Sequence, residues 1–145
     1  MPNYRHLLRP SQAWFSRAPS APEFPDRPLV SVVALDEVEP IELPQGSWSR
    51  MLVTGTRAGS ESSLGYSVFT PGTVLSPVRH ETEEVAYVVA GSGEIRLDDG
   101  AVPFRRGEAL HIPAGVWHAV ANTGDEDVVM VFGFPHPDYP PTERG

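Results

Sequence analysis

Short runs of alternating apolar and polar residues, rich in β-branched side chains, follow one another from Leu29 to Phe134. A period of two is typical of strands with one buried face, whereas helix signals are weak throughout this part of the chain. Glycine, proline and Asp-Gly signals separate the runs, as turns do between short strands. The pattern predicts strands over residues 29–35, 47–54, 62–70, 84–89, 94–97, 101–104, 108–112, 118–122 and 128–134.

This series of strands predicts an all-β fold. The segment Asp98-Asp99-Gly100 predicts a hairpin turn between the strands at 94–97 and 101–104. Short antiparallel strands must hide their edges, and closing into a small barrel or a two-sheet jelly roll does so. The interior of such a barrel is a natural place for a ligand. We therefore expect an antiparallel β-barrel with a small-molecule cavity.

The first 28 residues differ from the rest in composition. They contain six prolines and no acidic residue before Glu23, which suits an arm more than a core. A chain of 145 residues is of the size of one domain. We expect a proline-rich N-terminal arm over residues 1–28 and a single barrel domain over residues 29–145.

Charge and residue types exclude several classes of function. Eleven basic against nineteen acidic residues give a net charge of −8, which argues against nucleic acid and anionic membranes as partners. All basic residues are arginine, so no lysine is present for Schiff-base or Walker-type phosphate chemistry. No apolar run is long enough for a transmembrane span. Because cysteine is absent, a metal would have to be bound by histidine and carboxylate side chains.

Three residues are candidate metal ligands. His80 and Glu84 are four residues apart, and side chains at that spacing share one face of an extended strand. His118 would reach the same interior from a separate strand. Two neutral imidazoles and one carboxylate leave coordination positions open, as in non-haem Fe(II) enzymes, and are also compatible with Mn, Ni or Zn. The residues predict a divalent metal, with Fe(II) the first choice.

The same residues lie in two glycine-framed motifs that cover residues 72–122. The first consists of Gly72, Val78-Arg79-His80, Glu84 and Gly91, and it resembles the first motif of the cupin superfamily. The second consists of Gly107, Pro113-Ala114-Gly115, His118 and Asn122, and it resembles the second cupin motif. One position departs from the family pattern, because Val78 stands where the first motif normally has a histidine.

The resemblance implies the cupin-type antiparallel barrel, a double-stranded β-helix or jelly roll. It also implies metal ligation by His80, Glu84 and His118, with Val78 unable to supply the usual fourth ligand. Asn122 and the glycines would then have structural roles, and Gly91 and Gly115 would occupy turns with unusual backbone angles. The resemblance further implies a homodimer, formed through sheet edges or exchanged N-terminal segments. Without a signal peptide or lipid anchor in the sequence, the cytoplasm is the expected location.

Three functions stay open on these grounds. The first is a non-haem Fe(II) oxidoreductase of the dioxygenase or oxidase type, in which the metal supplies the redox chemistry. The second is a redox-neutral lyase, isomerase or cyclase, in which the metal acts as a Lewis acid. The third is a non-catalytic cupin that binds a small molecule. A small-molecule partner is common to all three.

The remaining polar and aromatic residues on the predicted strands are expected to be structural. His6, His111 and His136 are assigned structural roles, with a role in the site for His111 depending on which face of its strand is inside. Outward positions are predicted for Arg50 and Arg96, although an inward arginine could bind a carboxylate or phosphate. The aromatic side chains of the strands, Trp48, Tyr66 and Tyr87, are assigned to the core.

Overall fold

The longer strands form where the alternation of the sequence predicts them. The computed structural model describes residues 29–145, so the predicted arm over residues 1–28 lies outside the described residues. The strands are β1 (Ile41–Glu42), β2 (Trp48–Val53), β3 (Ser63–Phe69), β4 (Val78–His80), β5 (Glu84–Ala90), β6 (Ser92–Leu97), β7 (Gly100–Arg105), β8 (Ala109–Ile112), β9 (Ala119–Ala121), β10 (Val128–Phe134) and β11 (Thr142–Arg144). The helical elements are short: α2 (Gly55–Ala58) and the 3-10 turns η2 (Leu35–Glu37) and η3 (Pro44–Gly46).

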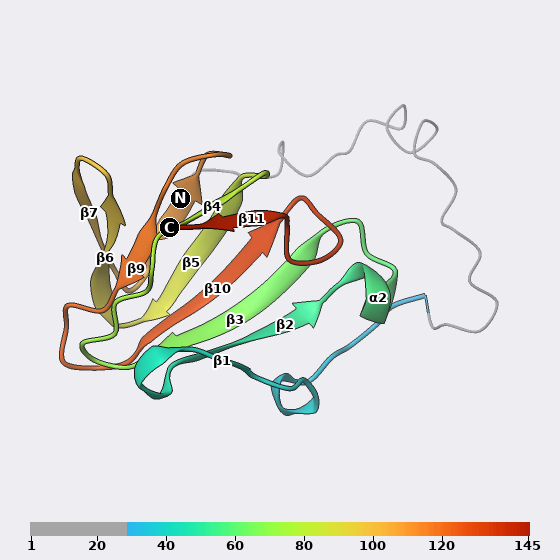
Figure 1. Cartoon of the computed structure of the whole chain (residues 1–145). Coiled ribbons are helices and arrows are strands. Elements are labelled where there is room, and N and C mark those ends of the chain that lie inside the picture. Colours follow the sequence, from blue (N-terminus) through green and yellow to red (C-terminus); the bar gives the residue numbers. More distant parts are fainter. Residues whose placement is uncertain (1–28) are drawn as a thin grey trace, which may run out of the picture. The chain divides into compact units, whose positions relative to one another are not determined.

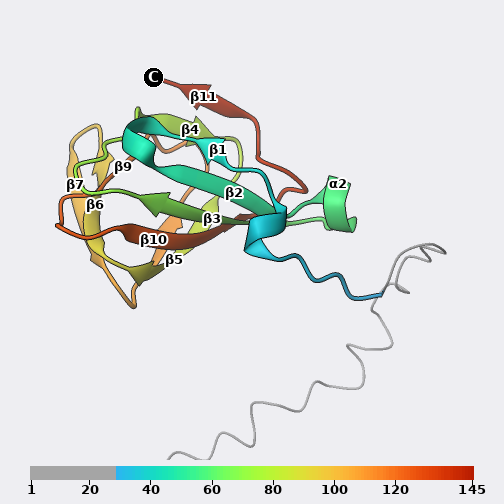
Figure 2. The ribbon, with the colours of Figure 1, turned by 90° about the horizontal axis from the view of Figure 1, so that it is seen from below.

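The paired strands are antiparallel throughout and form three sheets. Six strands follow the order β1-β2-β3-β10-β5-β8, and three follow the order β7-β6-β9. β4 pairs with β11 to make the third, two-stranded sheet. Figure 1 shows β2, β3, β10 and β5 side by side, and Figure 2 shows the curvature of this sheet as seen from below. The predicted all-β jelly roll is confirmed.

The core lies between the six-stranded and three-stranded sheets. Alternate side chains of β3, β5 and β10 meet those of β6 and β7, which is the pattern expected for two packed sheets. The largest buried cluster consists of Phe69, Val88, Ile95, Phe104, Val128 and Met130. A second cluster, of Ala86, Phe132 and Phe134, extends the apolar interior along β10. The inward row of β10 therefore connects the core with the end of the barrel where that strand stops.

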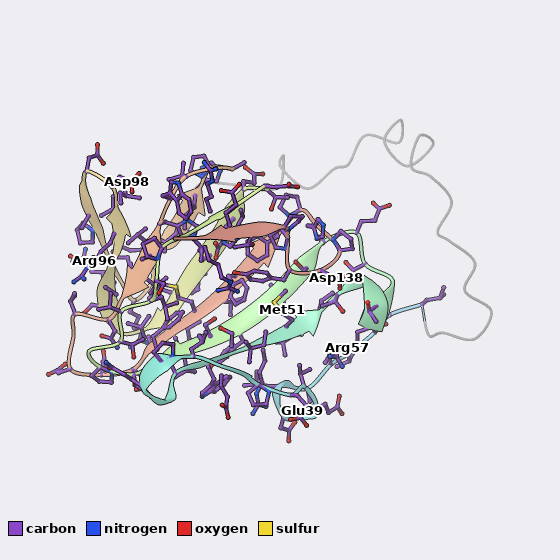
Figure 3. The ribbon with its side chains drawn as sticks, in the orientation of Figure 1. Glu39, Met51, Arg57, Arg96, Asp98 and Asp138 are labelled. Carbon is purple, nitrogen blue, oxygen red and sulfur yellow. The ribbon has the colours of Figure 1, made fainter. Side chains whose placement is uncertain are left out.

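Tight turns close the strands as predicted. In the β6–β7 hairpin Leu97 pairs with Gly100, which leaves Asp98 and Asp99 as the two turn residues. Asp98 stands at the tip of this hairpin (Figure 3). Gly91 has a φ of +81° and Gly115 a φ of +77°, the left-handed region that glycine adopts most readily. The expected unusual backbone angles at both glycines are thus present.

The strand predicted over residues 29–35 is wrong. Leu29 is 93% exposed, and no residue of this segment forms a strand; the chain turns into η2 at Leu35 instead. Apolar β-branched residues form a strand only where a sheet edge pairs with them, and none does so here. Among residues 29–145, no helix is long and apolar enough to cross a membrane.

Candidate metal centre

Three elements bring the candidate ligands together. His80 is the last residue of β4, and Glu84 is the first residue of β5 after a short turn. His118 lies next to β4, because Val78 and His118 form an antiparallel bridge with both backbone hydrogen bonds at 2.9 Å. Glu84 Oε2 is 3.2 Å from His80 Nε2 and 3.4 Å from His118 Nε2. The three ligand atoms all lie within 4.8 Å of one another.

Hydrogen bonds fix the orientation of both imidazoles. Thr142 Oγ1 donates its only proton to the carbonyl of Pro140 at 2.8 Å, so it accepts from His80 Nδ1 at 2.7 Å. His118 Nδ1 donates to the carbonyl of Val116 at 2.8 Å. Each Nδ1 therefore carries a proton, and each Nε2 presents a lone pair toward Glu84. Partners of this kind at the second ring nitrogen are typical of metal-binding histidines.

The donor set fits a divalent cation. The side chains of His80 and His118 are 4% and 5% exposed, and that of Glu84 is 16% exposed. Two lone pairs and a carboxylate facing one another in a buried place repel one another unless a cation lies between them. A divalent metal with nitrogen and oxygen ligands meets this need, so the residues present match the group that the sequence predicts.

Protons are the alternative cations at this place. Burial works against the imidazolium of His118, but hydrogen bonding and attraction to Glu84 outweigh it and raise the pKa of His118. Burial of Glu84 works against its charged form, yet hydrogen bonds from His118 and His80 and their charges lower the pKa of Glu84. Metal and proton therefore compete for the same lone pairs.

The cluster opens into an interior cavity of about 550 Å³. Inward side chains of β2, β3 and β10 line one wall of it, among them Met51, Ser67 and Phe132, and Val78 also lines it. Phe134 and Tyr139 pack edge-on against the ring of His80, with centroids 5.0 and 5.4 Å away. Burial first, and then the nearby charge of Glu84, raise the pKa of Tyr139. The cavity is of the size that holds a drug-sized ligand, with mostly apolar walls.

His111, His136, Arg50 and Arg96 lie outside the cavity lining, whereas His6 lies outside the described residues. His111 Nε2 is hydrogen-bonded to Glu83 Oε2 at 2.9 Å, with both side chains exposed. Arg96 pairs with Glu94 at 2.9 Å and points outward (Figure 3). Arg50 also lies on the outer face, where Nη1 donates to the carbonyl of Leu35 at 2.6 Å. The predicted outward positions of both arginines are confirmed.

Asn122 has the structural role that its motif implies. Its amide nitrogen donates to the carbonyls of Phe69 and Glu126, at 2.8 and 2.9 Å.

The aromatic residues that the sequence assigns to the core do not lie there. Tyr87 is exposed on the outer face of β5, and Trp48 stacks on Tyr66 outside the cavity, with ring centroids 5.9 Å apart. Alternation along a strand does not by itself say which face is inside, which is why these assignments failed.

Sequence reasoning missed the contribution of the last residues of the chain. Thr142 orients His80, and Tyr139 and Arg144 line the cavity, yet no strand was predicted after Phe134. The only local signal is Pro140-Pro141, which favours an extended backbone directly before β11. Three residues are too few for a period of two to be recognised.

Comparison with known proteins finds a matching family, similar sequences and a similar solved structure. The family model described as Cupin domain matches residues 65–134. Protein SchB of Streptomyces halstedii is 41% identical over 113 residues, which cover 74% of this chain and 81% of SchB. Polyketide synthase CurC of Streptomyces cyaneus is 33% identical over 108 residues, which cover 74% of this chain and 70% of CurC. The solved structure of the polyketide cyclase RemF from Streptomyces resistomycificus has a TM-score of 0.68 and 22% identity, and covers 79% of this chain and 84% of that one.

Proposed function

Since the chain belongs to the cupin family, we propose that it is a metal-dependent cyclase acting on an oxygen-rich, polyketide-type small molecule. One observation carries the proposal: the lone pairs of His80 and His118 and the carboxylate of Glu84 converge at a largely apolar cavity of about 550 Å³. The names polyketide synthase CurC and polyketide cyclase RemF, borne by two similar proteins, support the substrate class.

The residues of the centre have separate tasks in this proposal. His80 and His118 would hold a divalent metal through Nε2, and Glu84 would hold it through a carboxylate oxygen. When bound, such a metal supplies Lewis-acid chemistry, which polarises a substrate carbonyl and acidifies the neighbouring C–H bond. The hydroxyl of Tyr139 is protonated at neutral pH, and its raised pKa keeps it so at higher pH, so it can donate a hydrogen bond to a substrate oxygen.

The walls of the cavity favour ring closure over hydrolysis. Met130, Phe132 and Phe134 form a continuous apolar row along β10, and this row keeps water away from the reacting carbons. In the proposed reaction the activated carbon loses a proton and bonds to a carbonyl carbon, whose oxygen is protonated to a hydroxyl. That hydroxyl then leaves as water with a second proton from the activated carbon, and a carbon–carbon double bond remains. No electrons are gained or lost, so molecular oxygen is not required.

The Fe(II) oxidoreductase predicted from the sequence is the second candidate. The three ligands would leave neighbouring positions on one metal open for substrate and oxygen, which is the observation that favours it. Iron, dioxygenase activity, the homodimer and the cytoplasmic location all stay predictions. Oxygen dependence separates this candidate from the cyclase.

Elemental analysis and anaerobic turnover test the proposal together. We expect purified protein to contain close to one divalent metal per chain, lost in His118→Ala and kept in His111→Ala, whose histidine lies outside the cavity. With an aryl-terminated linear triketone, we expect a ring product lighter by one water without oxygen. A product formed only with Fe(II) and oxygen would favour the second candidate, and full metal content in His118→Ala would refute the ligand assignment.

A further inference from the structure

Two serine hydroxyls form a polar pair in the otherwise apolar wall of the cavity. Ser49 of β2 and Ser67 of β3 are direct partners in the strand register, and their Oγ atoms are 2.6 Å apart. Both serines line the cavity, and Ser67 is 3% exposed. Their partners on the adjoining strands are apolar, since Ile41 pairs with Ser49 and Met130 pairs with Ser67.

The serine pair has one hydroxyl proton that no hydrogen bond within the described residues uses. Two hydroxyls carry two protons, and the bond between Ser49 and Ser67 uses one of them. Neither hydroxyl has another hydrogen-bond partner among residues 29–145, so the second proton is free to turn toward the cavity that both serines line. A ligand oxygen that enters the cavity could accept this spare proton and so gain a hydrogen bond that the apolar wall does not otherwise offer.

A nearby group of hydroxyls shows what structural serines look like in this fold. Ser47 Oγ lies 2.8 Å from Thr73 Oγ1 and accepts from the backbone N–H of Thr70 at 3.0 Å. Thr70 Oγ1 in turn donates to the carbonyl of Gln45 at 2.8 Å. That group holds a turn to β2 and lies outside the cavity lining. Ser49 and Ser67 make no such bond to the backbone, so stabilising a turn does not explain them.

The serine pair lies far from the candidate metal ligands along the cavity. β2, β3 and β10 are neighbours in the sheet (Figure 1), and Ser67 is level with Met130 of β10. His80 packs against Phe134, which is four residues further along the same strand. At the usual rise of a strand this separation is about 13 Å. Phe132 lies between the two levels, and its ring occupies the space in front of Gly65.

We propose that Ser49 and Ser67 form a hydroxyl subsite that binds a carbonyl or phenol oxygen at the end of the substrate opposite the reacting end. The proposal rests on the proposed function and specifies that the substrate is elongated and carries a polar group at its far end. The ligand class is an elongated polyketone or fused-ring aromatic compound with oxygens at both ends and an apolar middle. The two serines are positioning residues, because they hold the far end while the metal ligands face the near end.

Two matched dyes test the subsite without turnover. Anthrarufin carries a hydroxyl beside a carbonyl at each end, whereas 1-hydroxyanthraquinone lacks the second hydroxyl. One hydrogen bond is worth about 1 kcal/mol, so we expect wild-type protein to bind anthrarufin about fivefold more tightly. In the double variant Ser49→Ala/Ser67→Ala the preference should vanish while binding of 1-hydroxyanthraquinone and the melting temperature hold.

The outcomes separate this proposal from the proposed function. Because the readout is a ratio of two dissociation constants, it can be measured in metal-free protein and in Glu84→Gln, where we expect the same fivefold ratio. If purified wild-type protein bound no metal and formed no ring product, the proposed cyclase function would be refuted, but the ratio of the two dissociation constants would still be expected to be fivefold. A double variant that keeps the preference, or a wild-type protein without one, would overturn the subsite. The single variants Ser49→Ala and Ser67→Ala serve if the double variant does not fold.

Discussion

Val78 and His118 face each other across two backbone hydrogen bonds of 2.9 Å, and the side chain of Val78 lines the same cavity that the imidazole of His118 enters. His80 lies two residues beyond Val78 on the same strand. The position at which the cupin pattern has a further histidine is therefore directed at the metal centre. An apolar side chain there leaves the candidate centre with His80, Glu84 and His118 as its three proposed ligands.

Restoring a histidine at this position should strengthen metal binding. We expect Val78→His to add a fourth nitrogen ligand and to tighten the binding of Zn²⁺ by about tenfold or more. Val102→His provides the control, because Val102 is exposed on β7 and lies away from the cavity lining. Competition with a chelating dye measures both affinities. Equal affinity of Val78→His and wild-type protein would contradict the direction assigned to this side chain.

Removing the hydroxyl that orients His80 should weaken the centre without unfolding the barrel. Thr142→Val keeps the shape of the side chain but leaves His80 Nδ1 without its acceptor. Loss of such a partner lowers metal affinity by about 10- to 100-fold. Thr82→Val is the matched control, since the Thr82 hydroxyl donates to the carbonyl of Glu83 and has no other hydrogen-bond partner among residues 29–145. The same dye competition reads both variants, and an unchanged Thr142→Val would refute the orienting role.

The stability of metal-free protein should depend on pH in both directions. The lowered pKa of Glu84 contributes stability above its ordinary value of 4.5, and this stability is lost as pH falls through the lowered pKa. The raised pKa of His118 contributes stability below its ordinary value of 6.5, which is lost as pH rises through the raised pKa. These contributions are therefore complete between pH 4.5 and 6.5.

Bound metal should reverse the alkaline part of this profile. Metal takes the lone pair for which the proton competes, so its affinity rises as pH increases through the raised pKa of His118. Melting temperatures between pH 4 and 9, with chelator and with saturating Zn²⁺, give both curves. In Glu84→Gln the alkaline loss in chelator should shrink, and persistence of the full loss would show that another group causes it.

Two glycines with similar backbone angles should respond differently to substitution. A Cβ at Gly91 would lie 2.5 Å from the carbonyl oxygen of Asp127, whereas nothing lies within 4 Å of a Cβ at Gly107. Gly107→Ala then costs only the backbone strain of a positive φ, about 1–2 kcal/mol. Gly91→Ala adds the displacement of a neighbouring strand and should cost about 2 kcal/mol more. Urea unfolding measures the difference, and equal losses would contradict it.

Elements whose residues alternate could be predicted from sequence, and elements defined by their partners could not. Strands β2, β3 and β10 run for six or seven residues with a regular period, and their predicted bounds are right to within about one residue. β1, β4 and β11 have two or three residues each, and pairing rather than periodicity makes them strands. Residues 29–35 show the reverse error, because their apolar content predicts a strand that no sheet edge receives.

In the candidate site, too, the residues that belong to a sequence motif could be predicted, and those defined by a distant partner could not. His80 and Glu84 are close in sequence and share one motif, and His118 lies in a second motif, so the residues that converge could be named in advance. Thr142 is 62 residues away from the histidine that it orients, and nothing near it in sequence indicates that contact. The serine pair is equally hidden, since two isolated serines on predicted strands are ordinary until the register places them opposite each other.

The pairing of β4 with β11 has a consequence for the kinetics of the centre. β4 holds His80 between the bridge at His118 and only three paired residues of β11, and short end strands open far more often than a whole domain unfolds. Each opening separates Thr142 from His80 and loosens one ligand. The off-rate of a bound metal should then follow the fraying of the last strand, so that the centre exchanges its ion within a barrel that stays folded.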